Sequence, residues 1–146
     1  MVNKYEAIVF DYGGTLGYLD KSKFLEVPQQ IQGLIASLHH RKYLLGIISN
    51  SNQLSDSHWV RSRLQKYGIL AYFEATLFVF KEDEIKPNPC VFRRMLDFLK
   101  VDASKALFVG DSERCDGGSK EVGMDFLHVK LDDAMWIAEL EDKLKW

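Results

Sequence analysis

The chain has 146 residues with a formal net charge of −2, and 47% of its residues are hydrophobic. That length is close to the usual size of one domain and the apolar fraction suffices for one core, so we expect a single domain over residues 1–146. No run of Lys and Arg stands out, which disfavours nucleic acid or an anionic membrane surface as a partner.

Short apolar runs alternate with helical patterns along the chain. The first run, residues 7–10, is rich in β-forming residues, which is typical of a strand buried on both faces. Further runs predict strands at residues 44–48, 77–80, 106–109 and 126–129. Between them apolar residues recur at helical spacing. The expected helix faces consist of Val27, Ile31, Leu34, Ile35 and Leu38; Val60, Leu64 and Tyr67; Val91, Phe92, Met95, Phe98 and Leu99; and Trp136, Ile137, Leu140 and Leu144.

Strands that alternate with helices predict an α/β fold, a doubly wound (Rossmann-like) domain with a parallel sheet of about five strands. Local signals mark some helix ends: Asn88 is a plausible N-cap with Pro89 in the first turn, and Gly68 is a plausible stop. Sheets of this kind bind their ligands at the carboxyl ends of the strands. The residues that follow each strand are therefore the candidate site residues.

Polar residues collect at these strand ends. Asp11, Ser49 and Asp111 each follow an expected strand, Lys86 lies in the loop after the third strand, and Asp116 comes soon after Asp111. Carboxylate oxygens are the ligands that Mg²⁺ prefers, and a lysine and a hydroxyl can hold phosphate oxygens. A carboxylate can also attack phosphorus and form an aspartyl-phosphate. The pattern favours phosphoryl chemistry at a magnesium site.

Four segments, in this order, resemble the motifs of the haloacid dehalogenase superfamily, whose members are mostly Mg²⁺-dependent phosphatases. They are residues 8–16 (IVFDYGGTL), 47–50 (IISN), 86–89 (KPNP) and 109–112 (VGDS) followed by Asp116. Each comes after its expected strand, and together they span nearly the whole chain.

The resemblance implies a role for each motif residue. Asp11 takes the position of the nucleophile, Ser49 and Lys86 those of phosphate-binding groups, and Asp11, Asp111, Asp116 and the backbone carbonyl of Gly13 those of the metal ligands. Two neighbours are candidates from their location: Asn50 for a contact with substrate, and Thr15 for a hydrogen bond that steadies the first loop. Glycines at 13 and 14 let the backbone approach a metal or phosphate closely.

The sequence departs from the superfamily pattern at two places. Phosphatases of the superfamily carry an acid–base aspartate two positions after the nucleophile, where this chain has Gly13. Such assistance is typically worth about 10²–10⁴-fold in rate. The glycine-rich segment after Asp116 is also one residue shorter than the usual pattern, which weakens the assignment of Asp116 relative to that of Asp111.

A cap domain is absent from the expected architecture. Only about ten residues separate Leu16 from the helix near Val27, and a domain needs tens of residues to bury a core. No large insertion separates Ser49 from Lys86 either. The resemblance is therefore to a capless member, whose open site would accept a small or macromolecular phosphorylated substrate.

Three hypotheses remain open. The first is a Mg²⁺-dependent phosphatase that is slow or uses a substitute acid, such as Tyr18, Asp20 or a group of the substrate. The second is a catalytically impaired protein that binds phosphate or metal on the same scaffold. The third, a dehalogenase-type hydrolase, is disfavoured because Asp111 keeps a metal site that dehalogenases do not need.

The remaining features concern the location and assembly of the protein. No stretch approaches the roughly 18 apolar residues of a membrane span, and the first residues lack the apolar run of a signal peptide. Cys90 and Cys115 are too few for a disulfide framework and fit a reducing compartment, so we expect a cytoplasmic protein. Residues 136–146 are expected to pack as a terminal helix, with a homodimer contact as the alternative.

Overall fold

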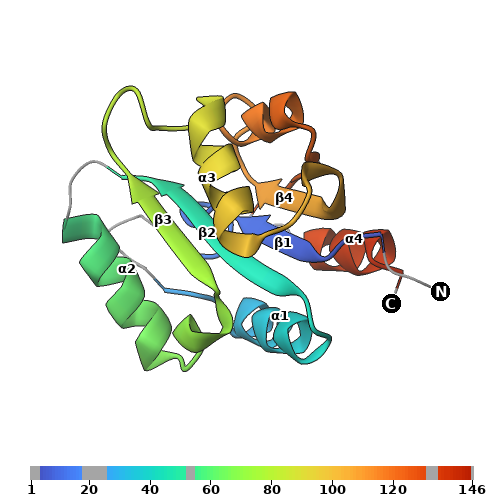
Figure 1. Ribbon diagram of the computed structural model, residues 1–146. Helices are drawn as coiled ribbons and strands as arrows, with labels where there is room; N and C mark the ends of the chain where they lie inside the picture. The colour runs from blue at the N-terminus through green and yellow to red at the C-terminus, as the bar shows by residue number, and fades with distance from the viewer. Residues whose placement is uncertain (1–3, 18–25, 52–54, 131–134, 146) are drawn as a thin grey trace.

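The computed structural model describes residues 4–17, 26–51, 55–130 and 135–145. In this part of the chain, five parallel strands form one sheet in the order β3-β2-β1-β4-β5 (Figure 1). The strands are β1 (Ala7–Phe10), β2 (Leu44–Asn50), β3 (Ala75–Val79), β4 (Ala106–Gly110) and β5 (Asp125–His128). This confirms the expected α/β class and the parallel sheet of five strands.

Helices cover both faces of the sheet. Within the described residues, the α-helices are α1 (Gln29–His40), α2 (Ser55–Lys66), α3 (Pro89–Leu99) and α4 (Met135–Lys143), and the short 3₁₀ helices are η1 (Leu70–Tyr72), η2 (Ala103–Lys105) and η3 (Asp116–Val122). Side chains of α1, α2 and α4 belong to one buried cluster, and side chains of α3 belong to a second (Figure 1). Among the described residues no further domain interrupts this arrangement, and none of their helices is long and apolar enough to cross a bilayer.

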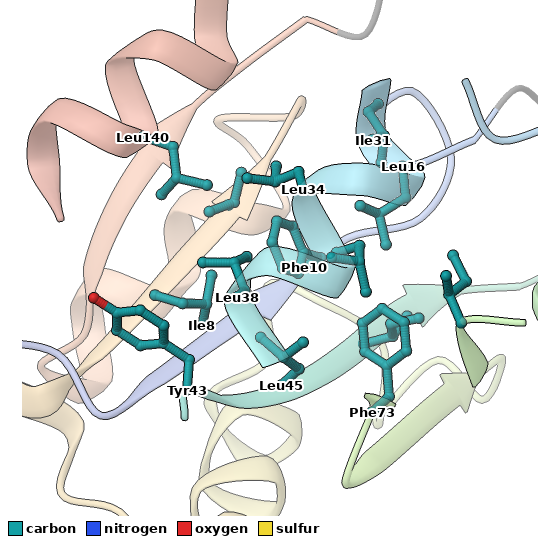
Figure 2. Close-up of a cluster of buried hydrophobic side chains, with 14 of the residues drawn as sticks. Ile8, Phe10, Leu16, Ile31, Leu34, Leu38, Tyr43, Leu45, Phe73 and Leu140 are labelled. Atoms are coloured by element: carbon teal, nitrogen blue, oxygen red, sulfur yellow. The ribbon is translucent and has the colours of Figure 1, made fainter. Parts of the chain in front are cut away.

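The two buried clusters follow from the alternation of side chains along a strand. In β1, Ile8 and Phe10 point into the cluster with α1 and α4 (Figure 2), whereas Ala7 and Val9 point into the cluster with α3. All four are fully buried. A strand covered on both faces has no reason to alternate polar and apolar residues, which explains why β1 is a continuous apolar run.

The helix α3 begins as the sequence predicts. The Asn88 side chain accepts a hydrogen bond from the N–H of Cys90, and Pro89 occupies the first turn. One predicted face residue is wrong: Phe98 is 60% exposed, and Leu96 is buried in its place. At 100° per residue, Phe98 lies roughly 90° from the centre of the buried stripe, so its side chain falls on the flank of the helix.

Two segments near the strand ends differ from the expected boundaries. Ser49 and Asn50 are the last two residues of β2, paired with Phe78 and Val79 of β3, and do not follow the strand. The segment that begins at Asp116 is a 3₁₀ helix. A 3₁₀ helix rises about 2.0 Å per residue, against 1.5 Å for an α-helix, so a shortened segment still spans the distance to β5.

Candidate active site at the carboxyl end of the sheet

Asp11 is fixed at the end of β1 by the backbone around it. Its N–H donates to the carbonyl of Val109 in β4 at 2.9 Å, which extends the sheet pairing by one residue. The chain then turns, and the N–H groups of Thr15, Leu16 and Gly17 all donate to the carbonyl of Tyr12. The Thr15 hydroxyl, fully buried, lies 3.4 Å from Asp11 Oδ2. This distance is long for an O–H···O hydrogen bond, and the steadying role of Thr15 stays a prediction.

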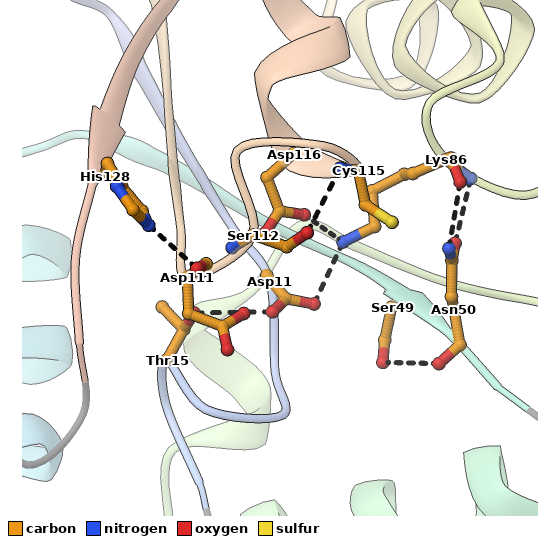
Figure 3. Close-up of polar contacts among 10 residues, drawn as sticks. All are labelled: Asp11, Thr15, Ser49, Asn50, Lys86, Asp111, Ser112, Cys115, Asp116 and His128. Carbon is orange, nitrogen blue, oxygen red and sulfur yellow. Dashed lines mark hydrogen bonds and ion pairs between the residues drawn. The ribbon is translucent and has the colours of Figure 1, made fainter.

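Lys86 reaches the end of β1 from the loop between β3 and α3. Its Nζ donates to Asp11 Oδ1 at 2.9 Å and to Asp116 Oδ1 (Figure 3). The Lys86 side chain is only 2% exposed, and Asp116 only 1%. One ammonium group is thus shared by two buried carboxylates from segments far apart in the sequence.

Two glycines make room for the carboxylates that follow β4. A Cβ at Gly110 would lie 2.3 Å from Asp116 Oδ2, and a Cβ at Gly14 would lie 2.2 Å from Asp111 Oδ2. Gly14 also has a φ of +79°, which non-glycine residues rarely adopt. The N–H of Ser112 donates to Asp116 Oδ2 at 3.0 Å, which fixes the orientation of that carboxylate.

The three aspartates form a group that could hold a metal ion. Asp11, Asp111 and Asp116 each offer a carboxylate oxygen, and these atoms all lie within 4.8 Å of one another. Asp111 is the most exposed of the three. An all-oxygen donor set with an open side suits Mg²⁺, which retains some of its waters. The carbonyl of Gly13, at an isolated bridge to Gly17, stays a predicted ligand.

The electrostatics of this cluster are dominated by burial. Burial raises the pKa of Asp11 to about 6, and the Lys86 ammonium limits that rise. Burial likewise raises the pKa of Asp116, again opposed by Lys86. Burial alone would lower the pKa of Lys86, but the carboxylates of Asp11 and Asp116 hold it above its ordinary value. The ammonium therefore stays charged while the carboxylates resist ionisation.

The end of β2 supplies the remaining candidates. Ser49 is 7% exposed, and its hydroxyl has one long contact, 3.5 Å to the carbonyl of Asn50. The Asn50 side chain bonds to the backbone of Lys86, with Lys86 N–H donating to Oδ1 at 2.9 Å and Nδ2 donating to the Lys86 carbonyl at 3.1 Å. Both residues lie at the edge of the sheet where Asp11 emerges (Figure 3).

One contact at this edge was not predicted from the sequence. His128 Nε2 lies 2.8 Å from the carbonyl oxygen of Asp111 (Figure 3). The two residues are 17 positions apart, but β4 and β5 are neighbours and His128 is in register with Gly110. The sequence places His128 within the expected strand at residues 126–129, but nothing in it indicates which strand is the neighbour. The suggested substitute acids Tyr18 and Asp20 lie outside the described residues.

The chain belongs to the family of haloacid dehalogenase-like hydrolases, whose sequence model matches residues 8–129. That range contains all four motifs and every candidate residue of the site. A glyceraldehyde 3-phosphate phosphatase of Pyrococcus abyssi is 36% identical over 100 residues, which is 68% of this chain. The chain spans only 40% of the length of that relative.

Solved structures share the fold at low sequence identity. A predicted HAD-like (haloacid dehalogenase-like) family hydrolase from Porphyromonas gingivalis superimposes with a TM-score of 0.78 at 16% identity, covering 98% of this chain and 99% of the other. A HAD family enzyme from Bacteroides thetaiotaomicron, solved as a magnesium complex, gives 0.76 at 17% identity, covering 90% and 96%. At such identities the likeness concerns the fold alone.

Proposed function

We propose that the protein is a Mg²⁺-dependent phosphatase that hydrolyses a phosphate monoester through an aspartyl-phosphate at Asp11. The observation that carries this is the position of Asp11, which contacts the Lys86 ammonium and belongs to a group of three carboxylates. The name of the phosphatase relative from Pyrococcus abyssi supports the reaction class. The magnesium complex of the Bacteroides enzyme supports the choice of metal.

Asp11 would act in two steps. In the first, a carboxylate oxygen of Asp11 forms a bond to phosphorus while the bond from phosphorus to the leaving oxygen breaks, and the leaving oxygen takes a proton. In the second, a water oxygen attacks phosphorus, the bond to Asp11 breaks and inorganic phosphate leaves. Gly13 has no side chain to move a proton in either step, so another group or the substrate must do so.

The other site residues bind and neutralise the phosphoryl group. Lys86 would offset its negative charge, and the hydroxyl of Ser49 would donate to one of its oxygens. Asp11, Asp111, Asp116 and the carbonyl of Gly13 would hold Mg²⁺, which supplies further charge neutralisation when bound. Residues 1–146 would act as one domain whose open site admits a phosphorylated small molecule or macromolecule.

A second candidate function is phosphate or metal binding without useful turnover. The observation that favours it is Gly13 itself, because the residues proposed to bind metal and phosphate are present while the acid–base position carries no side chain. A dehalogenase-type activity is the less favoured alternative, since the three clustered carboxylates are not needed for it.

The test is an assay of p-nitrophenyl phosphate with Mg²⁺ on the wild type, Asp11→Asn and Gly13→Asp. The phosphatase proposal predicts Mg²⁺-dependent turnover that Asp11→Asn abolishes. Gly13 is not among the glycines with positive φ, so an aspartate there does not meet the backbone strain of the left-handed region. Asp102→Asn, at an exposed carboxylate beside η2, is the matched control and should retain full activity.

The outcomes separate the candidates. If only Gly13→Asp turns over and the wild type is inert while still binding phosphate, the binding function replaces the enzymatic one. If no variant responds to Mg²⁺ in turnover or in phosphate binding, both proposals fail.

A further inference from the structure

The side chain of Asn50 makes a two-point contact with the backbone of a single residue. Lys86 N–H donates to Asn50 Oδ1 at 2.9 Å, and Asn50 Nδ2 donates to the Lys86 carbonyl at 3.1 Å (Figure 3). Both ends of the amide are thus used on Lys86. The contact bridges 36 positions in sequence and ties the loop before α3 to the last residue of β2.

The 3₁₀ helix η3 packs closely against the backbone next to Lys86, at Pro87. A Cβ added at Gly118 would lie 2.8 Å from the Cβ and from the carbonyl oxygen of Pro87. Backbone atoms cannot move aside cheaply, so a glycine at 118 allows η3 to approach Pro87 this closely. The Lys86–Pro87 segment therefore has the Asn50 amide as one support and the backbone of Gly118 as another.

Several other hydrogen bonds of the loop that carries Lys86 join residues of the loop to one another. Ile85 N–H donates to the carbonyl of Lys81, and Asn88 Nδ2 donates to the carbonyl of Asp83. Such bonds stabilise the conformation of the loop but do not fix its position relative to the sheet. The side-chain amide of Asn50 fixes that position, because Asn50 is itself paired with Val79 of β3.

We propose that Asn50 is a positioning residue, which fixes the backbone of Lys86 and thereby holds its ammonium between Asp11 and Asp116. The lysine side chain has a limited reach, so its ammonium can meet both carboxylates only from a suitable position of the Lys86 backbone. Asn50 acts through Lys86 and not on the substrate. Its effect on catalysis rests on the proposed phosphatase function, whereas its effect on Lys86 does not.

An asparagine suits this task because its amide offers a donor and an acceptor in one plane. Aspartate keeps the acceptor for Lys86 N–H but has no donor for the carbonyl. Leucine keeps the branching and approximate size of asparagine but has neither the hydrogen-bond donor nor the acceptor. Asn88 is the matched control, since its side chain also makes two bonds in the same loop, to Cys90 N–H and to the Asp83 carbonyl.

The first measurement needs no activity. NMR of the ¹⁵N-labelled full chain follows hydrogen exchange of the Lys86 amide and the ¹⁵Nζ signal of its buried ammonium. We expect Lys86 amide exchange to accelerate in Asn50→Leu and to be largely preserved in Asn50→Asp, with a shifted Nζ signal in both. Asn88→Ala should leave the Nζ signal in place. An unchanged Lys86 Nζ signal in folded Asn50→Leu and Asn50→Asp overturns the proposal.

The second measurement divides the kinetic effect on p-nitrophenyl phosphate. A displaced ammonium should lower kcat on the order of 10- to 100-fold in Asn50→Leu with a smaller change in KM. Asn88→Ala should keep the wild-type kcat. A rise in KM alone, with the Nζ signal unchanged, would assign Asn50 to direct substrate contact instead.

The two measurements test the phosphatase proposal and the role of Asn50 independently of each other. If the wild type shows no turnover, the phosphatase proposal fails, and the NMR comparison still decides whether Asn50 positions Lys86. If Asn50→Leu does not fold, Asn50→Asp carries the comparison, because it retains the bond to Lys86 N–H.

Discussion

Two clusters of lysine and aspartate lie at opposite ends of the same sheet. At the carboxyl end, Lys86 pairs with Asp11 at 2.9 Å, and their side chains are 2% and 11% exposed. At the amino end, Lys4 pairs with Asp125 at 2.8 Å, and their side chains are 65% and 40% exposed. The pairs have the same chemistry and nearly the same length. They differ in how much water reaches them.

That difference reverses the effect on the carboxylates. Burial raises the pKa of Asp11 to about 6 in spite of the lysine beside it. Hydrogen bonds from Lys4 and Tyr5 lower the pKa of Asp125, because its charge remains solvated and burial contributes little. An ion pair therefore favours ionisation where water remains, whereas in the interior desolvation outweighs it. Distance alone does not distinguish a site from a surface contact.

The largest expected effect is the loss of the buried cation. Lys86→Met keeps an apolar chain of similar length but leaves Asp11 and Asp116 buried without a counter-charge. We expect unfolding in urea at pH 7 with EDTA to show a loss of about 3–5 kcal/mol. Mg²⁺ should recover part of this loss, because it can neutralise the same carboxylates.

The control for this substitution is Lys105→Met, since Lys105 pairs with Glu6 at 3.3 Å with both side chains about half exposed. It should change the stability little. Equal losses of stability in the two variants would mean that burial does not distinguish these ion pairs.

The second expected effect is a pH dependence with a defined sign. The pKa of Asp11 is raised from 3.8 to about 6, so its protonated form favours the folded state. This contribution is fully present below about pH 4 and is lost as the pH rises through 6. Without metal, the free energy of unfolding should fall by about 2–3 kcal/mol over that range, at 1.36 kcal/mol per pKa unit.

Asp11→Asn should flatten this decline, leaving the part due to Asp116, whose pKa is also raised. Denaturant unfolding at pH 4, 5, 6 and 7 in EDTA makes the measurement. The assignment would be contradicted if the free energy of unfolding increased from pH 4 to 6 by the same amount in the wild type and in Asp11→Asn.

The smallest expected effect concerns the exposed pair. Lys4→Met should shift the unfolding midpoint at pH 7 only slightly, and less still at high salt, because Lys4 lies in solvent. Tyr5→Phe should cost more, about 1 kcal/mol, since Tyr5 is 4% exposed and its hydroxyl donates to Asp125. The reverse order of the two variants would show that the charge, and not the buried hydroxyl, anchors Asp125.

Asp125 should also titrate with the opposite sign to Asp11. Its pKa is lowered below 3.8, so its contribution is present above that value and is lost as the pH falls further. Thermal unfolding of Asp125→Asn at pH 5 and pH 3 tests this, with convergence on the wild type expected at the lower pH.

Much of the architecture was predictable from local patterns. All five strands were expected within a few residues of their observed bounds, because parallel strands buried on both faces are continuous apolar runs. The N-cap at Asn88 followed from its residue type and the proline after it. The error at Phe98 arose because an aromatic residue on the flank of a stripe matches helical periodicity almost as well as one at its centre.

The site was predictable only in part. The motifs indicated which residues meet at the carboxyl end of the sheet, and the structure brings Asp11, Lys86, Asp111 and Asp116 together there. Their catalytic roles stay predictions. The bonds from Asn50 to the Lys86 backbone and from His128 to the Asp111 carbonyl could not be predicted, because they join residues 36 and 17 positions apart and depend on side-chain direction.

The class of fold, the family and the set of polar residues at the strand ends follow from hydrophobic periodicity and motif order, which are properties of the linear chain. The packing of the whole chain settles which of two similar lysine–aspartate pairs is buried. It also decided that Asn50 holds Lys86 and that two glycines admit the carboxylates of Asp111 and Asp116. Burial and close approach are collective results of packing all the elements at once, and no single segment encodes them.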